Sequence, residues 1–201
     1  MGLSATPFGV LPNSIPPFST SGVLPPFRGP GSSVTDPATM SPYKTNMDSL
    51  VDRFATSTDR KSILSGLLSF RSHLRGLGIY GFQWLDGSFC EDVEATEGRS
   101  PRDIDVVTFF YRPAAATASS EWQQFCMAHP QTFDVPHLKG LYQTDAYFVD
   151  LSLPAPDIVS STRYWFGLFS HKRAIGLWKG MVQVTLDHND DSAALALLAG
   201  K

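Results

Sequence analysis

Two aspartates one residue apart, Asp103 and Asp105, open the apolar run 106–110 and have the type and spacing that metal chemistry requires. Side chains alternate between the two faces of a β-strand, so both carboxylates would lie on one face while Ile104 points into a core. Two adjacent negative charges repel each other, and a shared divalent cation removes that repulsion. Hard cations such as Mg²⁺ bind carboxylate oxygens together with substrate phosphates. The pattern therefore predicts a metal site, with two solvated carboxylates at a strand edge as the alternative.

A glycine and a serine, Gly87 and Ser88, stand upstream of this pair. They follow residues 79–86, which predict a short strand. Glycine lets the backbone come close to phosphate oxygens, and a serine hydroxyl with nearby N–H groups can donate hydrogen bonds to them. Together with the aspartates, these two residues favour a site for a phosphorylated substrate.

The rest of the chain alternates between predicted helices and strands that would position these residues. We expect strands at 79–86, from 103, at 141–153 and at 178–186. We expect two helices within 46–76, one at 119–129, one from 157 or 160 to 169, and a short last helix capped by Asp191. Between these elements we expect a turn or loop at 89–102, an irregular stretch at 130–140 and a basic loop at 171–173. This order predicts an α+β domain with a small mixed, mostly antiparallel sheet packed with helices.

Polar residues mark the starts of the first two helices. Asn46 or Asp48 can cap the first helix, and residues 56–59 offer a cap for the second. Apolar residues of the second helix recur at helical spacing, so its arginines, Arg60 and Arg71 among them, are expected on a solvated face.

Residues 1–45 are rich in proline, glycine and serine, and the segment 9–18 is partly repeated at 22–27. Proline fixes φ and removes a hydrogen-bond donor, which excludes a helix or a central strand here. We expect a partly disordered arm over 1–45, free over 1–20 and able to dock near 22–30, followed by one domain over 46–201. A proline-rich ligand for a partner protein is the alternative.

The composition excludes several classes of protein. The chain has 201 residues and a formal net charge of −3, which gives no overall electrostatic footprint for nucleic acid. No apolar run approaches the roughly 18–20 residues of a membrane span, and the amino terminus lacks a signal-peptide pattern. Two cysteines without metal-type spacing favour a reduced, cytoplasmic protein.

The motifs resemble, as a set, those of the polymerase-β-type nucleotidyltransferase superfamily: Gly87-Ser88, then Asp103-Ile104-Asp105-Val106, then Asp145 on a later strand. Longer strings, including RDIDVVTFF and TDAYFVDL, are similar to an uncharacterised bacterial family of minimal-nucleotidyltransferase-like proteins, over roughly residues 22–186. The resemblance implies the nucleotidyltransferase fold and a nucleoside triphosphate donor, with ATP favoured. Compact bacterial members often belong to toxin–antitoxin or anti-phage systems.

The implied chemistry is transfer of a nucleotidyl group to a hydroxyl of a protein, an RNA or a nucleotide. Asp103 and Asp105 would hold two divalent ions, Mg²⁺ or Mn²⁺, and Asp145 would complete the second metal site and help to deprotonate the acceptor. Asp145 and Asp150 face opposite ways on a regular strand, and Asp145 is favoured because it stands near the strand's start, as the family motif expects. A β-bulge would reverse this choice.

One departure from the family pattern lies after the Gly-Ser pair. Many members have a basic residue there, whereas this chain has Glu91 and Asp92. Arg102 and Lys179 are predicted to bind the triphosphate instead, and the remaining candidates are Arg99, Lys172 and Arg173.

Two alternatives to this activity remain open. The acidic residues also favour a catalytically inactive module of the same fold that binds a nucleotide or a partner protein. A third reading is an oligonucleotide or cyclic-dinucleotide synthase.

Overall fold

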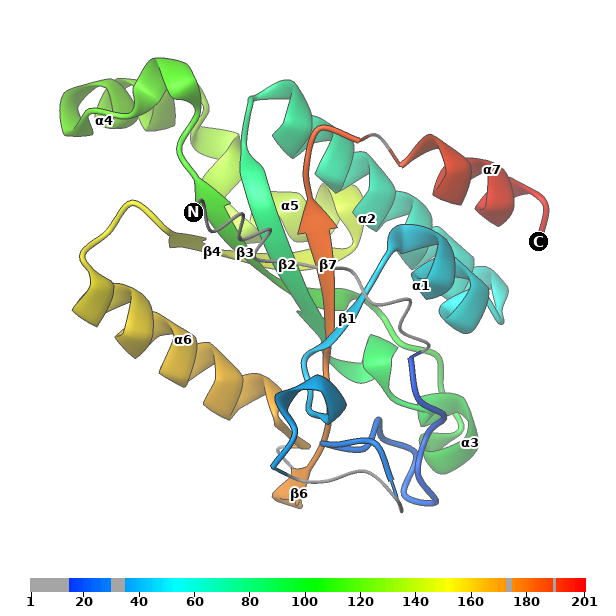
Figure 1. Ribbon diagram of the computed structural model, residues 1–201. Coiled ribbons are helices and arrows are strands. Elements are labelled where there is room, and N and C mark those ends of the chain that lie inside the picture. Colours follow the sequence, from blue (N-terminus) through cyan, green and yellow to red (C-terminus); the bar gives the residue numbers. More distant parts are fainter. Residues whose placement is uncertain (1–14, 30–34, 173–174, 190) are drawn as a thin grey trace, which may run out of the picture.

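The computed structural model describes residues 15–29, 35–172, 175–189 and 191–201, so most of the predicted free tail, residues 1–14, lies outside the described part. A five-stranded sheet forms its centre, in the order β1-β7-β2-β3-β4 (Figure 1). The strands are β1 (Tyr43–Thr45), β2 (Tyr80–Asp86), β3 (Ile104–Tyr111), β4 (Thr144–Asp150) and β7 (Val182–Leu186). A second, two-stranded sheet pairs β5 (His171–Lys172) with β6 (Leu177–Trp178).

The five-stranded sheet is mixed. Its inner pairs, β7 with β2 and β2 with β3, are antiparallel, whereas the outer pairs, β1 with β7 and β3 with β4, are parallel. Across both sheets the antiparallel pairs join more residues than the parallel pairs do. The predicted α+β class is confirmed at this level.

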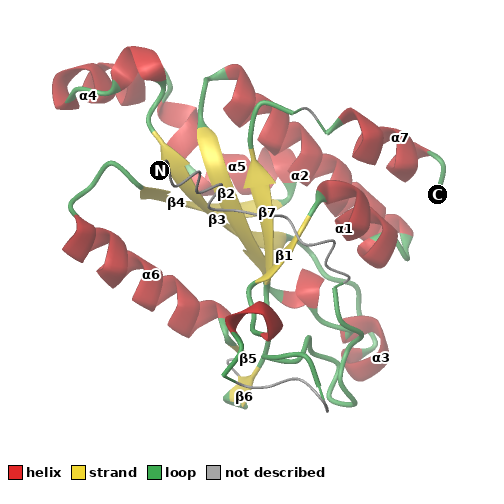
Figure 2. Cartoon of the chain, in the orientation of Figure 1, coloured by secondary structure: helices red, strands yellow, loops and turns green. Residues whose placement is uncertain are grey.

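Helices cover both faces of the sheet (Figure 2). The described residues contain α1 (Met47–Phe54), α2 (Thr58–Gly76), α3 (Val93–Glu97), α4 (Ser119–Ala128), α5 (Val135–Tyr142), α6 (Ala155–Phe169) and α7 (Ser192–Ala199). Helices α1, α2, α5 and α7 contribute to the larger apolar core on one face, and α6 packs against the smaller core on the other. Among the described residues, no helix is both long enough and apolar enough to cross a bilayer.

The predicted helix starts are confirmed where a side chain caps the backbone. Asn46 accepts a hydrogen bond from the Ser49 N–H at 2.8 Å, and Ser57 accepts one from the Arg60 N–H at 3.3 Å. Asp191 precedes α7 as expected but makes no side-chain cap. Its carboxylate binds two arginines of α2 instead.

Helix α5 corrects the prediction of an irregular stretch at 130–140. Asp134 caps it through the His137 N–H, and Pro136 lies in its first turn. Proline is well tolerated there because its missing N–H would have no partner within the helix. The following strand, β4, therefore begins at Thr144 rather than at Leu141.

The predicted strand at 178–186 is divided in two. Between β6 and β7, the Lys179 N–H donates to the Ser170 carbonyl at 2.8 Å, and the Gly180 N–H donates to the Leu24 carbonyl at 2.7 Å. At this point, hydrogen bonds with distant segments thus replace the hydrogen bonds between neighbouring strands.

The prediction of a solvated arginine face on α2 is wrong for two of its residues. Arg60 and Arg71 are each only 2% exposed. Arg60 binds Glu94 and the carbonyls of Phe89 and Glu91. Burial of these guanidinium groups is possible because acceptors from distant segments surround them.

The amino-terminal arm packs on the domain from Ile15 onward. Ile15 and Leu24 belong to the larger core, and Phe18 packs against it. The Pro25 carbonyl accepts a hydrogen bond from the Tyr43 hydroxyl at 2.7 Å. Residues 15–20, expected to be free, are therefore anchored by apolar contacts.

Candidate functional site

Three aspartates lie side by side on neighbouring strands. The register pairs Asp86 of β2 with Asp105 of β3, and Asp105 with Asp145 of β4. Residues directly opposite one another in a sheet point to the same face. Trp84 is two residues from Asp86 on β2, and Val107 is two residues from Asp105 on β3, so each shares a face with its aspartate. Trp84 and Val107 belong to the core beneath α6. The three carboxylates therefore lie on the α6 face, at one end of the sheet.

A lysine joins two of the predicted metal ligands. The Lys139 ammonium lies 2.7 Å from Asp103 Oδ2 and 3.0 Å from Asp145 Oδ2. The ammonium donates hydrogen bonds to both carboxylates, and these bonds, the one to Asp103 foremost, raise the pKa of Lys139 above its ordinary range. Lys139 thus supplies a positive charge between Asp103 and Asp145.

The Gly-Ser pair begins directly after β2. Gly87 has φ 79°, and a Cβ atom there would lie 2.5 Å from Asp105 Oδ2. A side chain would therefore be strained and would collide with the carboxylate. Gly87, Ser88 and Asp105 line a polar cavity of about 120 Å³, whose other lining residues include Asp86, Glu91, His171, Lys172 and Lys179.

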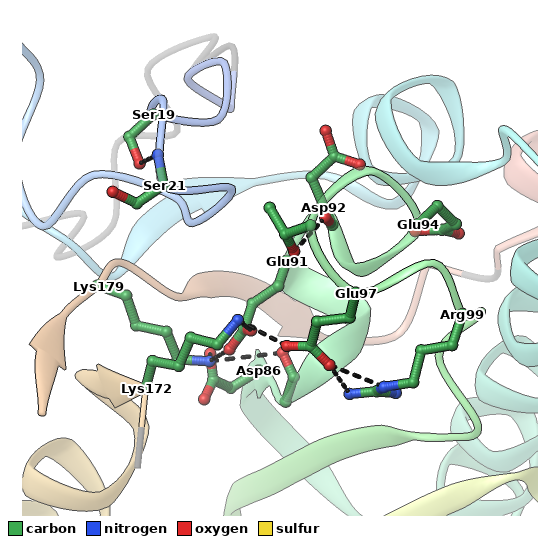
Figure 3. Close-up of polar contacts among 12 residues, drawn as sticks. Ser19, Ser21, Asp86, Glu91, Asp92, Glu94, Glu97, Arg99, Lys172 and Lys179 are labelled. Atoms are coloured by element: carbon green, nitrogen blue, oxygen red, sulfur yellow. Dashed lines mark hydrogen bonds and ion pairs between the residues drawn. The ribbon is translucent and has the colours of Figure 1, made fainter. Parts of the chain in front are cut away.

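Two lysines neutralise Glu91, one of the two acidic residues that follow the Gly-Ser pair. Lys179 Nζ lies 2.6 Å from Glu91 Oε1, and Lys172 Nζ lies 3.2 Å from Glu91 Oε2. Figure 3 shows the two lysines beside Glu91. Lys172 Nζ also lies 2.7 Å from Glu97 Oε1. Glu91 is thus a counterion of the cavity wall rather than an unpaired negative charge.

The second acidic residue of that departure, Asp92, faces a helix start. Its side chain accepts a hydrogen bond from the Ala95 N–H at 3.4 Å and so caps α3. Asp92 is therefore occupied locally and does not line the cavity.

Asp86 is a buried carboxylate that the sequence reading did not select. It is 3% exposed, and its Oδ1 lies 3.1 Å from Lys179 Nζ without accepting a hydrogen bond. Burial raises the pKa of Asp86 from 3.8 to about 7, although Lys179 acts in the opposite direction. Burial alone would lower the pKa of Lys179, but Asp86 and Glu91 raise it overall. The signal for Asp86 was its spacing from Trp84, which places it on the same face of β2.

This shift predicts that burial of Asp86 lowers the free energy of unfolding as pH rises, and that the variant Asp86→Asn removes this pH dependence. Between pH 4 and 7 the unfolded chain loses the Asp86 proton while the folded protein keeps it, so wild-type stability falls as pH rises. We expect the free energy of unfolding of Asp86→Asn, relative to wild type, to be at least about 1 kcal/mol more favourable at pH 8 than at pH 4. Denaturant unfolding in EDTA at the two pH values measures this. An equal difference at both would contradict the assignment.

The remaining predicted residues either lie outside this cavity or are already held in ion pairs. Arg102 is exposed and does not line it. Lys179 lines it, but its ammonium is already paired with Asp86 and Glu91. Asp150, the alternative third carboxylate, pairs with Arg112 at 2.7 Å. The odd spacing from Asp145 places Asp150 on the opposite face of β4.

The site offers oxygen donors of the kind that Mg²⁺ takes. In the described part of the chain, no three His, Cys, Asp or Glu side chains are gathered as metal ligands. Asp105 and Asp145 are nevertheless neighbours in register, and Asp103 and Asp145 already share one cation, the Lys139 ammonium. The carboxylates are therefore of the type that a hard divalent cation takes, while Lys139 lies between two of them.

Comparison with protein families gives a match over residues 16–185 to a family of unknown function, DUF6932. The chain belongs to the DUF6932 family. The matched range of DUF6932 contains every residue of the cavity as well as Asp103, Lys139 and Asp145. Comparisons with curated proteins and with solved structures gave no match.

Proposed function

We propose that this protein is a nucleotidyltransferase of the polymerase-β-type fold that uses Mg²⁺ or Mn²⁺ and a nucleoside triphosphate, with ATP as the first donor to test. One observation carries the proposal: Asp86, Asp105 and Asp145 are aligned across three strands, and the first two of them line one cavity with Gly87 and Ser88. Carboxylates next to a backbone that can approach phosphate are what metal-dependent phosphoryl chemistry requires.

In this proposal some residues bind the nucleotide donor and others hold the metal. The backbone at Gly87 and the Ser88 hydroxyl would donate hydrogen bonds to phosphate oxygens. Asp103, Asp105 and Asp145 would hold two divalent ions, which neutralise charge on the triphosphate. Lys172 and Lys179 keep the cavity wall in place through Glu91, which supports donor binding despite the acidic residues there.

The transfer itself exchanges one phosphorus–oxygen bond for another. An acceptor hydroxyl oxygen bonds to the α-phosphorus, the bond from that phosphorus to the pyrophosphate oxygen breaks, and the hydroxyl proton passes to the Asp145 carboxylate. The acceptor is a hydroxyl of a protein, an RNA or a nucleotide. A cytoplasmic bacterial protein of this kind, acting with a partner protein in a toxin–antitoxin or anti-phage system, is part of the same proposal.

Label transfer from α-labelled nucleoside triphosphates tests this activity. The protein is incubated with Mg²⁺ or Mn²⁺, alone and with cell RNA or lysate. We expect transfer and pyrophosphate release, and a decrease of about 100-fold or more in Asp103→Asn/Asp105→Asn because the negative charges that hold the cation are lost.

Asp150→Asn is the matched control, because it removes a carboxylate from the other face of β4. It should retain transfer, whereas Asp145→Asn should not. Absence of both transfer and metal-dependent nucleotide binding in the wild type would overturn the proposal.

A second candidate, a non-catalytic module that binds a nucleotide or a partner protein, is favoured by one specific contact. Lys139 already neutralises Asp103 and Asp145. If this state persists with nucleotide present, equilibrium dialysis will show nucleotide binding while the labelled assay shows no transfer.

A further inference from the structure

The position of Lys139 is determined by the backbone and not only by its side chain. Lys139 lies near the end of α5, and its carbonyl accepts a hydrogen bond from the Gln143 N–H at 3.0 Å. The Gln143 carbonyl in turn accepts one from the Ile104 N–H at 3.1 Å. Two hydrogen bonds thus connect the Lys139 backbone to the residue that follows Asp103.

The same connection continues into β4. Ile104 pairs in register with Thr144, so Asp145 directly follows the residue opposite Ile104. The end of α5, the start of β3 and the start of β4 therefore meet at one point. An ammonium on Lys139 is delivered between Asp103 and Asp145 by this junction, and the last turn of a helix also favours a cation.

The three side chains differ in their exposure in a way that bears on ion binding. The Lys139 side chain is 47% exposed, whereas those of Asp103 and Asp145 are 22% and 20% exposed. The carboxylates are thus partly enclosed while the ammonium reaches them from solvent. The Lys139 ammonium is accessible to solvent, and in the described structure it occupies the space between the two acids.

Asp105 has a different environment. It lines the cavity with Ser88, Lys172 and Lys179, and it faces Asp86 across β2 and β3. A divalent ion at Asp105 would be adjacent to the space available for phosphates. An ion between Asp103 and Asp145 would have to displace Lys139.

We propose that Lys139 is a built-in cation that takes the place of one divalent ion, so that the protein binds one ion per chain where three carboxylates alone would accept two. This inference rests on the proposed function and revises the expectation of two ions. Lys139 is a positioning residue that holds Asp103 and Asp145 together and reserves the cavity side, at Asp105, for the single ion.

Mn²⁺ titration followed by the EPR signal of the free ion tests the inference without reference to activity. We expect one Mn²⁺ per wild-type chain in the presence of a non-hydrolysable ATP analogue. Lys139→Met removes the charge and keeps much of the side-chain length. The Lys139→Met protein should bind a second Mn²⁺, and its affinity for this second ion should be at least about tenfold higher than that of the wild type. Lys139→Arg should restore the single ion.

Two further variants keep the result interpretable. Lys139→Gln replaces the methionine variant if that protein unfolds at a lower temperature than the wild type. Lys201→Met removes the lysine of an exposed ion pair with Asp52 and should leave ion binding unchanged.

The outcomes separate the inference from the proposed function. Equal Mn²⁺ number and affinity in wild type, Lys139→Met and Lys139→Gln would overturn the role of Lys139 and leave the metal site standing. No Mn²⁺ bound by any variant, with or without nucleotide, would overturn both.

Discussion

Replacing Asp191 with alanine is expected to lower the free energy of unfolding by about 3–5 kcal/mol, because a buried guanidinium loses its counterion. Asp191 Oδ2 lies 2.7 Å from Arg71 Nε and 3.0 Å from Arg75 Nη1. Arg71 also donates to Gln83 and to the Thr185 carbonyl, and only 2% of it is exposed. It cannot reach water without leaving the core. Denaturant unfolding followed by circular dichroism measures the loss.

Asp52→Ala provides the matched control for this prediction. Asp52 pairs with Lys201 at 3.0 Å, but its side chain is 76% exposed. An exposed pair of this kind contributes about 0–1 kcal/mol. Similar losses in the two variants would show that burial of Arg71 does not determine the energy.

The second large effect is expected at Gly66, in the middle of α2. A Cβ atom there would lie 2.0 Å from the Tyr142 carbonyl oxygen at the end of α5. Backbone cannot yield as a flexible side chain does, so Gly66→Ala must displace α5 from α2. We expect a decrease in stability of about 3 kcal/mol or more, at the upper end of overpacking effects. Thermal and denaturant unfolding report this loss.

Gly76→Ala is the control from the same helix. Apart from the backbone of its own helix and its two chain neighbours, no atom lies within 4 Å of the Cβ position at Gly76. Alanine has the better helix propensity by up to about 1 kcal/mol, so this variant should be as stable as the wild type or more stable. If Gly66→Ala behaved like Gly76→Ala, the close approach of α5 to α2 would be wrong.

The sequence was sufficient for elements whose signals are local. Asn46 and Ser57 cap their helices through their own neighbouring N–H groups, so their types and positions alone indicate where the helices start. The strand at 80–86 was likewise predictable, because its end is marked by Gly87, the residue that directly follows it. For the same reason, Asp105 and Asp145 could be selected as candidate ligands before their register was known.

Other features depend on contacts between distant segments. Arg71 looks like a surface residue of an amphipathic helix until Asp191, 120 positions away, is placed beside it. Lys139 could not be selected because α5 was not predicted: Pro136 is usually read as a helix breaker, and only its place in the first turn makes it compatible. The division of β6 from β7 likewise depends on Leu24.

The assignment of donor-binding residues shows the same limit. Arg102 was chosen for its adjacency to Asp103, but both residues precede β3, and Arg102 is exposed and does not line the cavity. Lys179 was chosen for its charge, and the structure shows that charge already paired with Asp86 and Glu91. Residue type alone does not reveal which charges are available to a ligand.

The docked arm also has a consequence for how the protein is made. The Gly22 carbonyl accepts a hydrogen bond from the Asp92 N–H at 2.8 Å, and the Leu24 carbonyl accepts one from the Gly180 N–H at 2.7 Å. Two walls of the cavity are thus adjacent to a segment near the beginning of the chain. During synthesis, residues 22–24 leave the ribosome long before Gly180 does. Contacts over so large a sequence separation form slowly. The cavity can therefore be completed only after Gly180 has been translated, later than the helices and turns that depend on local contacts alone.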